Sequence, residues 1–117
     1  MPFENRVDDL PARVLVVDDD ASIRLTLVKL LQKEGYEVIQ AENGTHALDI
    51  ISAELPSLIL LDVVMPEVDG FEVCEAVRQR DPRVPIIMLT GMEDVSAIDN
   101  AFAKGATDFI TKPISWP

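Results

Sequence analysis

Short apolar runs alternate along this chain with longer segments in which apolar residues recur at helical spacing. The runs predict buried β-strands at 14–17, 36–41, 58–62, 86–89 and 108–111, because turn signals bound them. The intervening segments predict amphipathic helices over 21–34, around 47–51, from 70 to about 81 and around 95–102. A regular alternation of strand and helix implies an α/β fold with a parallel sheet and right-handed crossovers.

Turn-forming residues mark where the predicted helices begin and end. Gly35 and Gly105 are expected to close the first and fourth helices as C-caps. Pro56 ends the second helix, and Asp69-Gly70 begins the third after a sharp turn. The 117 residues are enough for one domain. Residues 1–12 are expected to form a flexible tail, because they are polar and lack periodicity.

Most of the predicted strands end in residues that can carry chemistry. The first ends in Asp18 and Asp19, the third in Asp62, the fourth in Thr90 and the fifth in Lys112. The carboxyl ends of parallel strands meet at one edge of a sheet, and ligands bind outside that edge. Taken alone, Asp62 is also compatible with the start of a plain turn, and Thr90 with a plain strand end. The convergence of several strand ends favours a shared site.

Carboxylates gathered at one edge predict a bound cation. Two unit charges about 4 Å apart repel by roughly 4 kcal/mol at an effective dielectric constant of about 20. Mg²⁺ suits oxygen ligands and takes one or two carboxylates while keeping several waters. Lys112 would add a second positive charge beside Asp62, and Thr90 a hydroxyl donor. Because a carboxylate can attack phosphorus to form an acyl phosphate, the constellation predicts phosphoryl transfer to Asp62.

Charge and cysteine content narrow the choice of partners and compartment. The formal net charge is -11 at pH 7, which repels nucleic acid and anionic lipid, so we expect direct binding to neither. No apolar run reaches the length of a membrane span, and no signal peptide is visible. The single cysteine, Cys74, is expected to pack in the core, and a reducing cytoplasm fits. His46 is expected on the surface, away from the acids.

Four segments together carry a family resemblance: VLVVDDD at 14–20, LILLDVVMPEVDG at 58–70, IIMLTG at 86–91 and GATDFITKP at 105–113. From Arg13 to Pro113 the chain resembles the receiver domain of two-component response regulators. The resemblance implies a flavodoxin-like, doubly wound, five-stranded parallel sheet with strand order 2-1-3-4-5. It also implies a phosphoacceptor signalling switch that assists its own phosphorylation and dephosphorylation rather than a conventional enzyme.

The same resemblance implies a ligand set for Mg²⁺ around the phosphoacceptor. Asp62 would accept the phosphoryl group. Asp19, Asp62 and the backbone carbonyl of Val64 would bind Mg²⁺ directly, and Asp18 would act mainly through a metal-bound water.

The switch residues follow in the same way. Lys112 would pair with the phosphoryl oxygens, and Thr90 would turn its hydroxyl onto them. Phe109 would occupy the aromatic switch position, although a core role alone is also compatible with its sequence. The Lys112–Pro113 peptide bond would be cis, which is found in about 5–6% of X–Pro bonds generally.

Two positions depart from the polar groups that members of this family can use to place a hydrolytic water. Val64 stands two residues after Asp62, and Met92 two residues after Thr90. Both are apolar, so we expect the acyl phosphate to be lost slowly.

The carboxyl end departs from the family pattern as well. After Lys112-Pro113 there is no room for the fifth helix that family members pack beside the first. We therefore expect a receiver domain over 13–117 that stops after the fifth strand, within a longer regulator that carries an output domain. Leu25 and Val28, or their neighbours, would be uncovered, and an exposed apolar strip of this kind would favour association, for example as a homodimer. The implied upstream partner is a sensor histidine kinase or a phosphotransfer protein.

Other functions fit parts of the same pattern. A magnesium-dependent phosphatase of haloacid dehalogenase type would use Asp18 and Asp20 as an Asp-x-Asp motif, with Thr90 and Lys112 as later motifs. It leaves Asp62 without a role, and the chain is short for that family. A scaffold with an inactive site is disfavoured because all key residues are present. A flavodoxin-like nucleotide binder is disfavoured because acids replace a Gly-rich phosphate loop.

Overall fold

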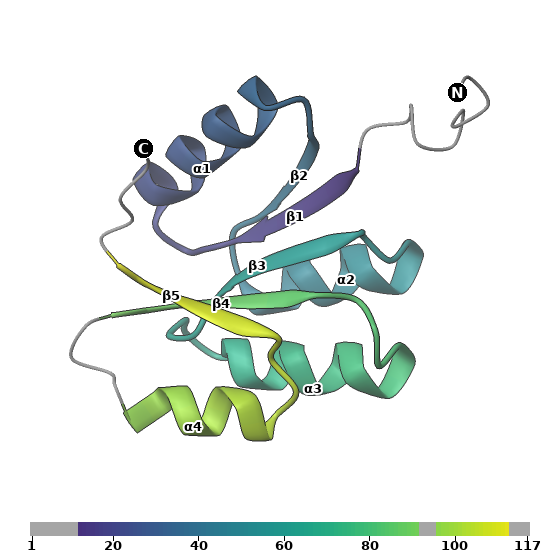
Figure 1. Cartoon of the computed structure of the whole chain (residues 1–117), viewed down its shortest axis with the longest axis vertical. Coiled ribbons are helices and arrows are strands. Elements are labelled where there is room, and N and C mark those ends of the chain that lie inside the picture. Colours follow the sequence, from purple (N-terminus) through teal and green to yellow (C-terminus); the bar gives the residue numbers. More distant parts are fainter. Residues whose placement is uncertain (1–11, 92–95, 113–117) are drawn as a thin grey trace, which may run out of the picture.

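A computed structural model of the chain describes residues 12–91 and 96–112. The described strands are β1 (Arg13–Val17), β2 (Glu37–Ala41), β3 (Leu58–Asp62), β4 (Ile86–Gly91) and β5 (Asp108–Lys112). The described helices are α1 (Ala21–Lys33), α2 (Gly44–Ala53), α3 (Gly70–Arg80) and α4 (Ser96–Ala103). Strand and helix alternate throughout, as the sequence pattern predicts (Figure 1).

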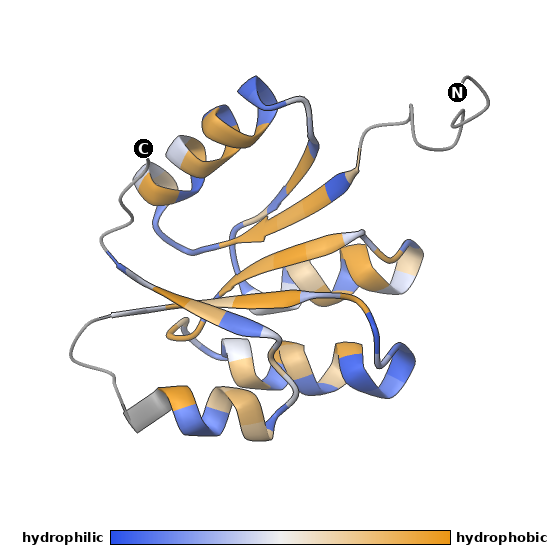
Figure 2. Ribbon diagram, in the orientation of Figure 1, coloured by the Kyte–Doolittle hydropathy of each residue, from blue (hydrophilic) through white to orange (hydrophobic). Residues whose placement is uncertain are grey.

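The strands form one parallel sheet in the order β2-β1-β3-β4-β5, which confirms the predicted flavodoxin-like order. Helix α1 covers one face of the sheet, and α2, α3 and α4 lie on the other (Figure 1). The three central strands β1, β3 and β4 are hydrophobic along most of their length, whereas the edge strands β2 and β5 are mixed (Figure 2). Mostly apolar strands are expected where helices bury both faces of a parallel sheet.

Each face of the sheet has its own hydrophobic core. The core under α2, α3 and α4 includes Leu61 and Met88, whereas the core under α1 includes Leu60, Leu89 and Leu27. Neighbouring residues of one strand, such as Leu60 and Leu61, therefore belong to opposite cores, because side chains alternate across a strand. This alternation also decides which strand-end residues share a pocket.

Strands β4 and β5 are longer than the sequence pattern predicts. Thr90 pairs with Thr111, and Gly91 pairs with Lys112, so the backbone ladder continues to the sheet edge. Thr90 is the next-to-last residue of β4 and Lys112 the last residue of β5, so both lie at strand ends, as predicted.

Both predicted glycine C-caps are confirmed. Gly35 has a φ of 95° and Gly105 a φ of 108°, in the region that only glycine adopts without strain. Helix α1 ends at Lys33, one residue earlier than predicted, and the Tyr36 amide donates to the Leu31 carbonyl at 3.1 Å to close it.

Several predicted environments can be compared with the structure. Cys74 is buried in the core and His46 is exposed on α2, as predicted. Leu25 is 47% exposed on α1, as expected, whereas Val28 is only 7% exposed. Val28 is one of the three buried residues of α1, together with Leu27 and Leu31.

Some predictions concern residues outside the described ranges and stay predictions. They are the tail up to residue 11, the apolar role of Met92, the cis bond before Pro113 and a domain that stops after the fifth strand. Among the described helices, none combines the length and the apolar character needed to cross a membrane.

Arg78 joins the last turn of α3 to the beginning of β5. Its Nε donates to the Gly105 carbonyl at 2.7 Å, and its guanidinium also donates to the Val84 carbonyl at 2.7 Å and to Thr107 Oγ1 at 3.3 Å. A planar guanidinium can satisfy several acceptors at once. The start of β5 is therefore tied to α3.

A strained residue lies in the loop between β3 and α3. Glu67 has a φ of 66°, where a residue with a Cβ pays about 1 to 2 kcal/mol and asparagine pays less. We expect Glu67→Asn to raise the free energy of unfolding by up to about 1 kcal/mol, measured by urea denaturation. Glu42→Asn, at an exposed residue without a positive φ, is the control. An equal gain in both variants would contradict the assignment of strain to Glu67.

Candidate functional site

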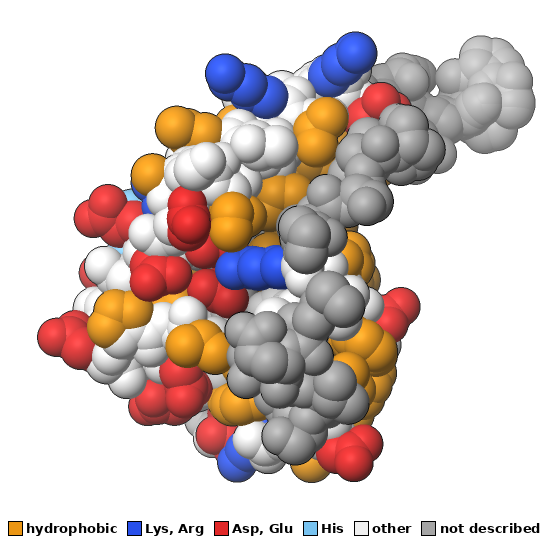
Figure 3. All heavy atoms as spheres, turned by 90° about the vertical axis from the view of Figure 1, so that its left-hand side faces the viewer, with side chains coloured by type: hydrophobic (Ala, Val, Ile, Leu, Met, Phe, Trp, Pro, Cys, Tyr) orange, Lys and Arg blue, Asp and Glu red, His pale blue; other side chains and the backbone are white. Residues whose placement is uncertain are grey.

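The strand register brings the predicted site residues to one edge of the sheet. Val17 pairs with Leu61, so Asp18 and Asp62, the residues that follow, lie side by side where β1 and β3 end. An open pocket of about 370 Å³ lies at this edge, lined by Asp18, Asp19, Asp20, Ile23, Asp62, Val64, Gly91 and Lys112. Acidic side chains gather beside a basic one on this face of the molecule (Figure 3).

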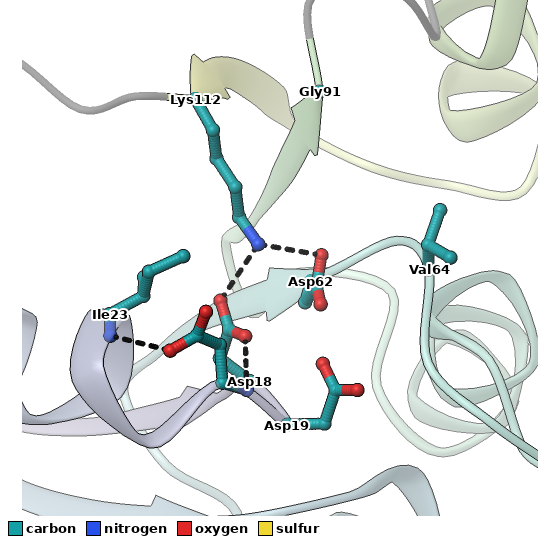
Figure 4. Close-up of a pocket in the computed structure, with 8 residues that line it drawn as sticks. Asp18, Asp19, Ile23, Asp62, Val64, Gly91 and Lys112 are labelled. Carbon is teal, nitrogen blue, oxygen red and sulfur yellow. Dashed lines mark hydrogen bonds and ion pairs between the residues drawn. The ribbon is translucent and has the colours of Figure 1, made fainter.

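Lys112 bridges the two buried acids of the pocket. Its Nζ lies 3.0 Å from Asp18 Oδ2 and 3.1 Å from Asp62 Oδ1 (Figure 4). Asp18 is fully buried and Asp62 is 5% exposed. Charged groups with so little water around them are stable only when they are paired, so this bridge is the main electrostatic contact of the site.

The pocket also holds a set of oxygen ligands for a metal ion. Asp18, Asp19 and Asp62 each offer a carboxylate oxygen, and these oxygens all lie within 4.8 Å of one another. Asp18 already has one oxygen 3.0 Å from Lys112. Asp19 is exposed, and its carboxylate points into the pocket (Figure 4). Hard carboxylate oxygens at an open, partly hydrated site fit Mg²⁺.

The third acid of the sequence run has a structural role. Asp20 is the N-cap of α1, and its Oδ1 accepts hydrogen bonds from the amides of Ser22 at 2.9 Å and Ile23 at 3.2 Å. It lines the pocket but does not belong to the group of three carboxylates. An Asp-x-Asp motif in which Asp18 and Asp20 act together does not fit this arrangement.

Burial and charge act on the ionisation of both members of the central ion pair. Burial and the neighbouring Asp18 raise the pKa of Asp62 to about 7, although Lys112 acts in the opposite direction. Burial lowers the pKa of Lys112, but its bonds to Asp18 and Asp62 outweigh this and raise it above the ordinary value. Lys112 therefore stays charged at neutral pH. Any further cation placed beside Asp62 would favour the ionised form of its carboxyl group.

Phe109 packs on the face of the sheet that α4 covers, and Thr90 lies next to the carboxyl end of β4, at the same edge of the sheet as the ion pair. Thr90 is 2% exposed, and its hydroxyl lies 3.4 Å from the Gly91 carbonyl; it is not among the residues that line the pocket. Phe109 is half-buried, packs against the core under α4 and makes an edge-to-face contact with Phe102 at 5.9 Å. Its strand partner Met88 belongs to that core too. Side-chain alternation gives Thr90 the same side as Met88.

Two residues near the pocket, Ile23 and Arg24 of α1, were not predicted from motifs. Ile23 lines the pocket together with the predicted Val64, which is 62% exposed. Arg24 donates a hydrogen bond from its guanidinium to the Asp18 carbonyl at 2.7 Å. The position of Arg24 is a weak sequence signal. A cation in the first turns of a helix is unfavourable, which suggests that a nearby acceptor binds its guanidinium.

Comparison with known proteins assigns the chain to a family. The profile described as response regulator receiver domain matches residues 14–116. The probable transcriptional regulator ycf27 of Porphyra purpurea is 48% identical over 103 residues, which are 88% of this chain and 42% of that protein. Response regulator MprA of Mycolicibacterium vanbaalenii is 41% identical over 106 residues, 91% of this chain and 46% of that protein. The chain thus spans less than half the length of these relatives.

Solved structures show the same fold. A putative response regulator from Chloroflexus aurantiacus superposes with a TM-score of 0.85 at 39% identity, covering 91% of this chain and 88% of that one. The chemotaxis protein CheY4 of Vibrio cholerae also gives a TM-score of 0.85, at 38% identity, covering 91% of this chain and 90% of that one. These comparisons do not support the phosphatase alternative. With its sheet order, its acidic pocket and these relatives, the chain belongs to the response regulator receiver domain family.

Proposed function

We propose that Asp62 is the phosphoacceptor of this receiver domain and takes its phosphoryl group from a histidine kinase or a phosphotransfer protein. The observation that carries the proposal is the position of Lys112, whose ammonium lies within 3.1 Å of Asp62 and 3.0 Å of Asp18. Asp62 faces an open pocket, and its neighbouring cation can pair with the oxygens of an incoming phosphoryl group. Positioning and charge neutralisation of this kind supply most of the catalysis of phosphoryl transfer.

The proposed reaction forms one bond and breaks one. A carboxylate oxygen of Asp62 attacks phosphorus, and the bond from phosphorus to the imidazole nitrogen of the donor histidine breaks. The imidazole leaves with the bonding electrons and takes up a proton from water. Lys112 holds the charge of the transferred oxygens. Ionised Asp62 is the nucleophile. Its pKa is about 7 in the metal-free protein, so a cation beside it is expected to favour the reactive form, and the reaction is expected to slow at acid pH.

Mg²⁺ is the cofactor that the donor set fits. We assign direct ligation to Asp19, Asp62 and the backbone carbonyl of Val64, and a water-mediated contact to Asp18. When bound, the ion would neutralise charge on the acids and on the phosphoryl oxygens. The cluster of carboxylate oxygens within 4.8 Å supports this assignment.

The phosphorylated state is proposed to act through Thr90 and Phe109. Phosphorylation places new negative charge at Asp62, which draws the Thr90 hydroxyl and Lys112 toward it and alters the packing of Phe109 against α4. A coupling of about 1 to 3 kcal/mol would change partner affinity about 5- to 150-fold. We place the output domain on a longer parent chain in the cytoplasm, since the matched relatives are more than twice as long as the segment they share with this one.

The test is to map the modified residue. The chain is incubated with acetyl phosphate and Mg²⁺, the acyl phosphate is reduced with borohydride, and the modified residue is found by peptide mass spectrometry. We expect modification at Asp62 that disappears when EDTA replaces Mg²⁺. Modification at Asp18, or none with the metal present, would overturn the proposal.

A further prediction concerns the lifetime of the acyl phosphate. Val64 is exposed at the pocket rim, and its apolar side chain cannot hydrogen-bond a hydrolytic water. We expect Val64→Asn to shorten the lifetime by about tenfold, within the range of general acid–base and positioning effects. Loss of radiolabelled phosphate in Mg²⁺ measures it. Val68→Asn, in the same loop but not lining the pocket, is the control, and an unchanged lifetime in Val64→Asn would refute the prediction.

A further inference from the structure

We propose that Arg24 is a positioning residue that fixes the turn between β1 and α1 and thereby sets the place of Asp19. The proposal rests on the proposed Mg²⁺ role of the acidic pocket. Arg24 is half-buried on α1. One guanidinium nitrogen donates to the Asp18 carbonyl at 2.7 Å, and Nε donates to Gln40 Oε1 at 3.2 Å. A single side chain thus links α1, the end of β1 and β2.

The contact acts on Asp19 through the peptide bond. The Asp18 carbonyl and the Asp19 amide belong to one rigid planar unit, so holding the carbonyl oxygen also orients the bond that leads into Asp19. Asp19 is exposed, and its carboxylate is therefore placed mainly by its own backbone. Arg24 is in this way a determinant of where the most accessible oxygen ligand of the pocket lies.

Other bonds hold the same turn from different directions. The Asp18 amide donates to the Ala41 carbonyl at 3.3 Å, and Asp18 Oδ1 accepts from the Asp20 amide at 2.9 Å. These bonds fix the two ends of the turn, and the bond from Arg24 fixes the carbonyl between them. Arg24 itself is anchored in the helix, where its amide donates to the Asp20 carbonyl at 2.9 Å.

The forked guanidinium is required as well as its charge. A lysine at position 24 would supply the positive charge but could not donate in two fixed directions to Asp18 and Gln40. Partners that orient metal ligands from behind typically contribute about 10- to 100-fold to metal affinity. We therefore expect Arg24→Met to weaken Mg²⁺ binding about tenfold and Arg24→Lys to recover part of the loss.

The test is calorimetric titration with Mg²⁺ of the parent chain, Arg24→Met, Arg24→Lys and the control Lys29→Met. Lys29 is exposed on the same helix, so its variant removes the same charge without touching the turn, and we expect its affinity to stay within about twofold. A metal-free readout accompanies the titration. Exchange of the Asp20 amide hydrogen, which is bonded to Asp18 Oδ1, should be faster in Arg24→Met than in Lys29→Met.

The outcomes separate this inference from the proposed function. A parent chain that fails to bind Mg²⁺ would overturn both. A parent that binds Mg²⁺ together with a folded Arg24→Met of unchanged affinity, or with a Lys29→Met weakened equally, would overturn the role of Arg24 alone. If Arg24→Met does not fold, the Mg²⁺ affinity of Arg24→Lys tests the role of Arg24. We expect it to be about threefold weaker than that of the parent, and an affinity equal to that of the parent would overturn the inference.

Discussion

Asp62→Asn is expected to abolish acyl phosphate formation and, at the same time, to stabilise the fold at neutral and alkaline pH. The loss of phosphorylation follows because an amide is not a nucleophile toward phosphorus under these conditions. The gain in stability follows because burial and Asp18 disfavour the ionised form of Asp62. Active sites commonly hold such unfavourable charges, which are needed for function and lower the stability of the free protein.

The pH dependence of this gain has a definite sign. The pKa of Asp62 is about 7 in the folded state, against an ordinary value of 3.8. Below about pH 4 the Asp62 side chain is protonated in both the folded and the unfolded state, and its contribution to the free energy of unfolding is fully present. That contribution is lost as the pH rises through the folded-state pKa of about 7, because the buried side chain must then ionise. Asparagine does not titrate. The advantage of Asp62→Asn should thus be small at pH 4 and reach about 1 to 3 kcal/mol at pH 8 in metal-free buffer.

Urea denaturation from pH 4 to 8 in EDTA measures the advantage, and Asp49→Asn, an exposed acid on α2, is the matched control. The control should change stability by less than about 0.5 kcal/mol at every pH. A gain for Asp62→Asn that does not vary with pH would contradict the electrostatic origin. Labelling of Asp62→Asn at another residue to the level of the parent would contradict the assignment of the acceptor.

Gly70→Ala is expected to lower the free energy of unfolding by about 3 kcal/mol, the upper end of typical overpacking effects. A Cβ at position 70 would lie 2.3 Å from the Asp62 carbonyl oxygen and 2.9 Å from Val63 Cα. Both are backbone atoms, so no side-chain rotation can relieve the contact. The Gly70 amide also donates to the Val63 carbonyl at 3.0 Å, which holds the start of α3 against the end of β3.

The same substitution should affect the site, because it displaces the backbone that carries Asp62. We expect Gly70→Ala to phosphorylate at least tenfold more slowly than the parent, since displacements of about 1 Å can cost about 100-fold in rate. Gln79→Ala, exposed on the same helix, is the control and should be near neutral in both stability and rate. Parental stability in Gly70→Ala would show that α3 can move away from β3 without strain.

Most of the fold could be predicted from sequence because its signals are local. The apolar runs, the glycine caps at Gly35 and Gly105 and the break at Pro56 each depend on a few neighbouring residues. The errors were at boundaries, such as the Glu34 end of α1 and the extension of β4 and β5. Pairing with a neighbouring strand decides where a strand ends, and that information is not contained in the strand itself.

The site could be predicted in part, for the same reason. Strand-end placement located Asp18, Asp62 and Lys112 correctly at one edge, because parallel strands put their carboxyl ends together. It did not show that Thr90 lies outside the lining of the pocket, because the orientation of a side chain at a strand end depends on the residues packed around it. The contact of Arg24 with the Asp18 carbonyl depends on how α1 packs over β1 and β2, which no short motif encodes.

The division of residues between the two faces of the sheet has a consequence for signalling. Asp62 and Lys112 lie at the pocket beside α1, whereas Phe109 packs toward α4. Only the backbone of the sheet separates the proposed phosphorylation site from the α4 face, where a partner would bind. Successive residues of a strand, about 3.3 Å apart, point to these two opposite faces. Phosphorylation and output are therefore expected to be separable: a substitution on the α4 face should abolish the response of a partner without slowing phosphorylation of Asp62.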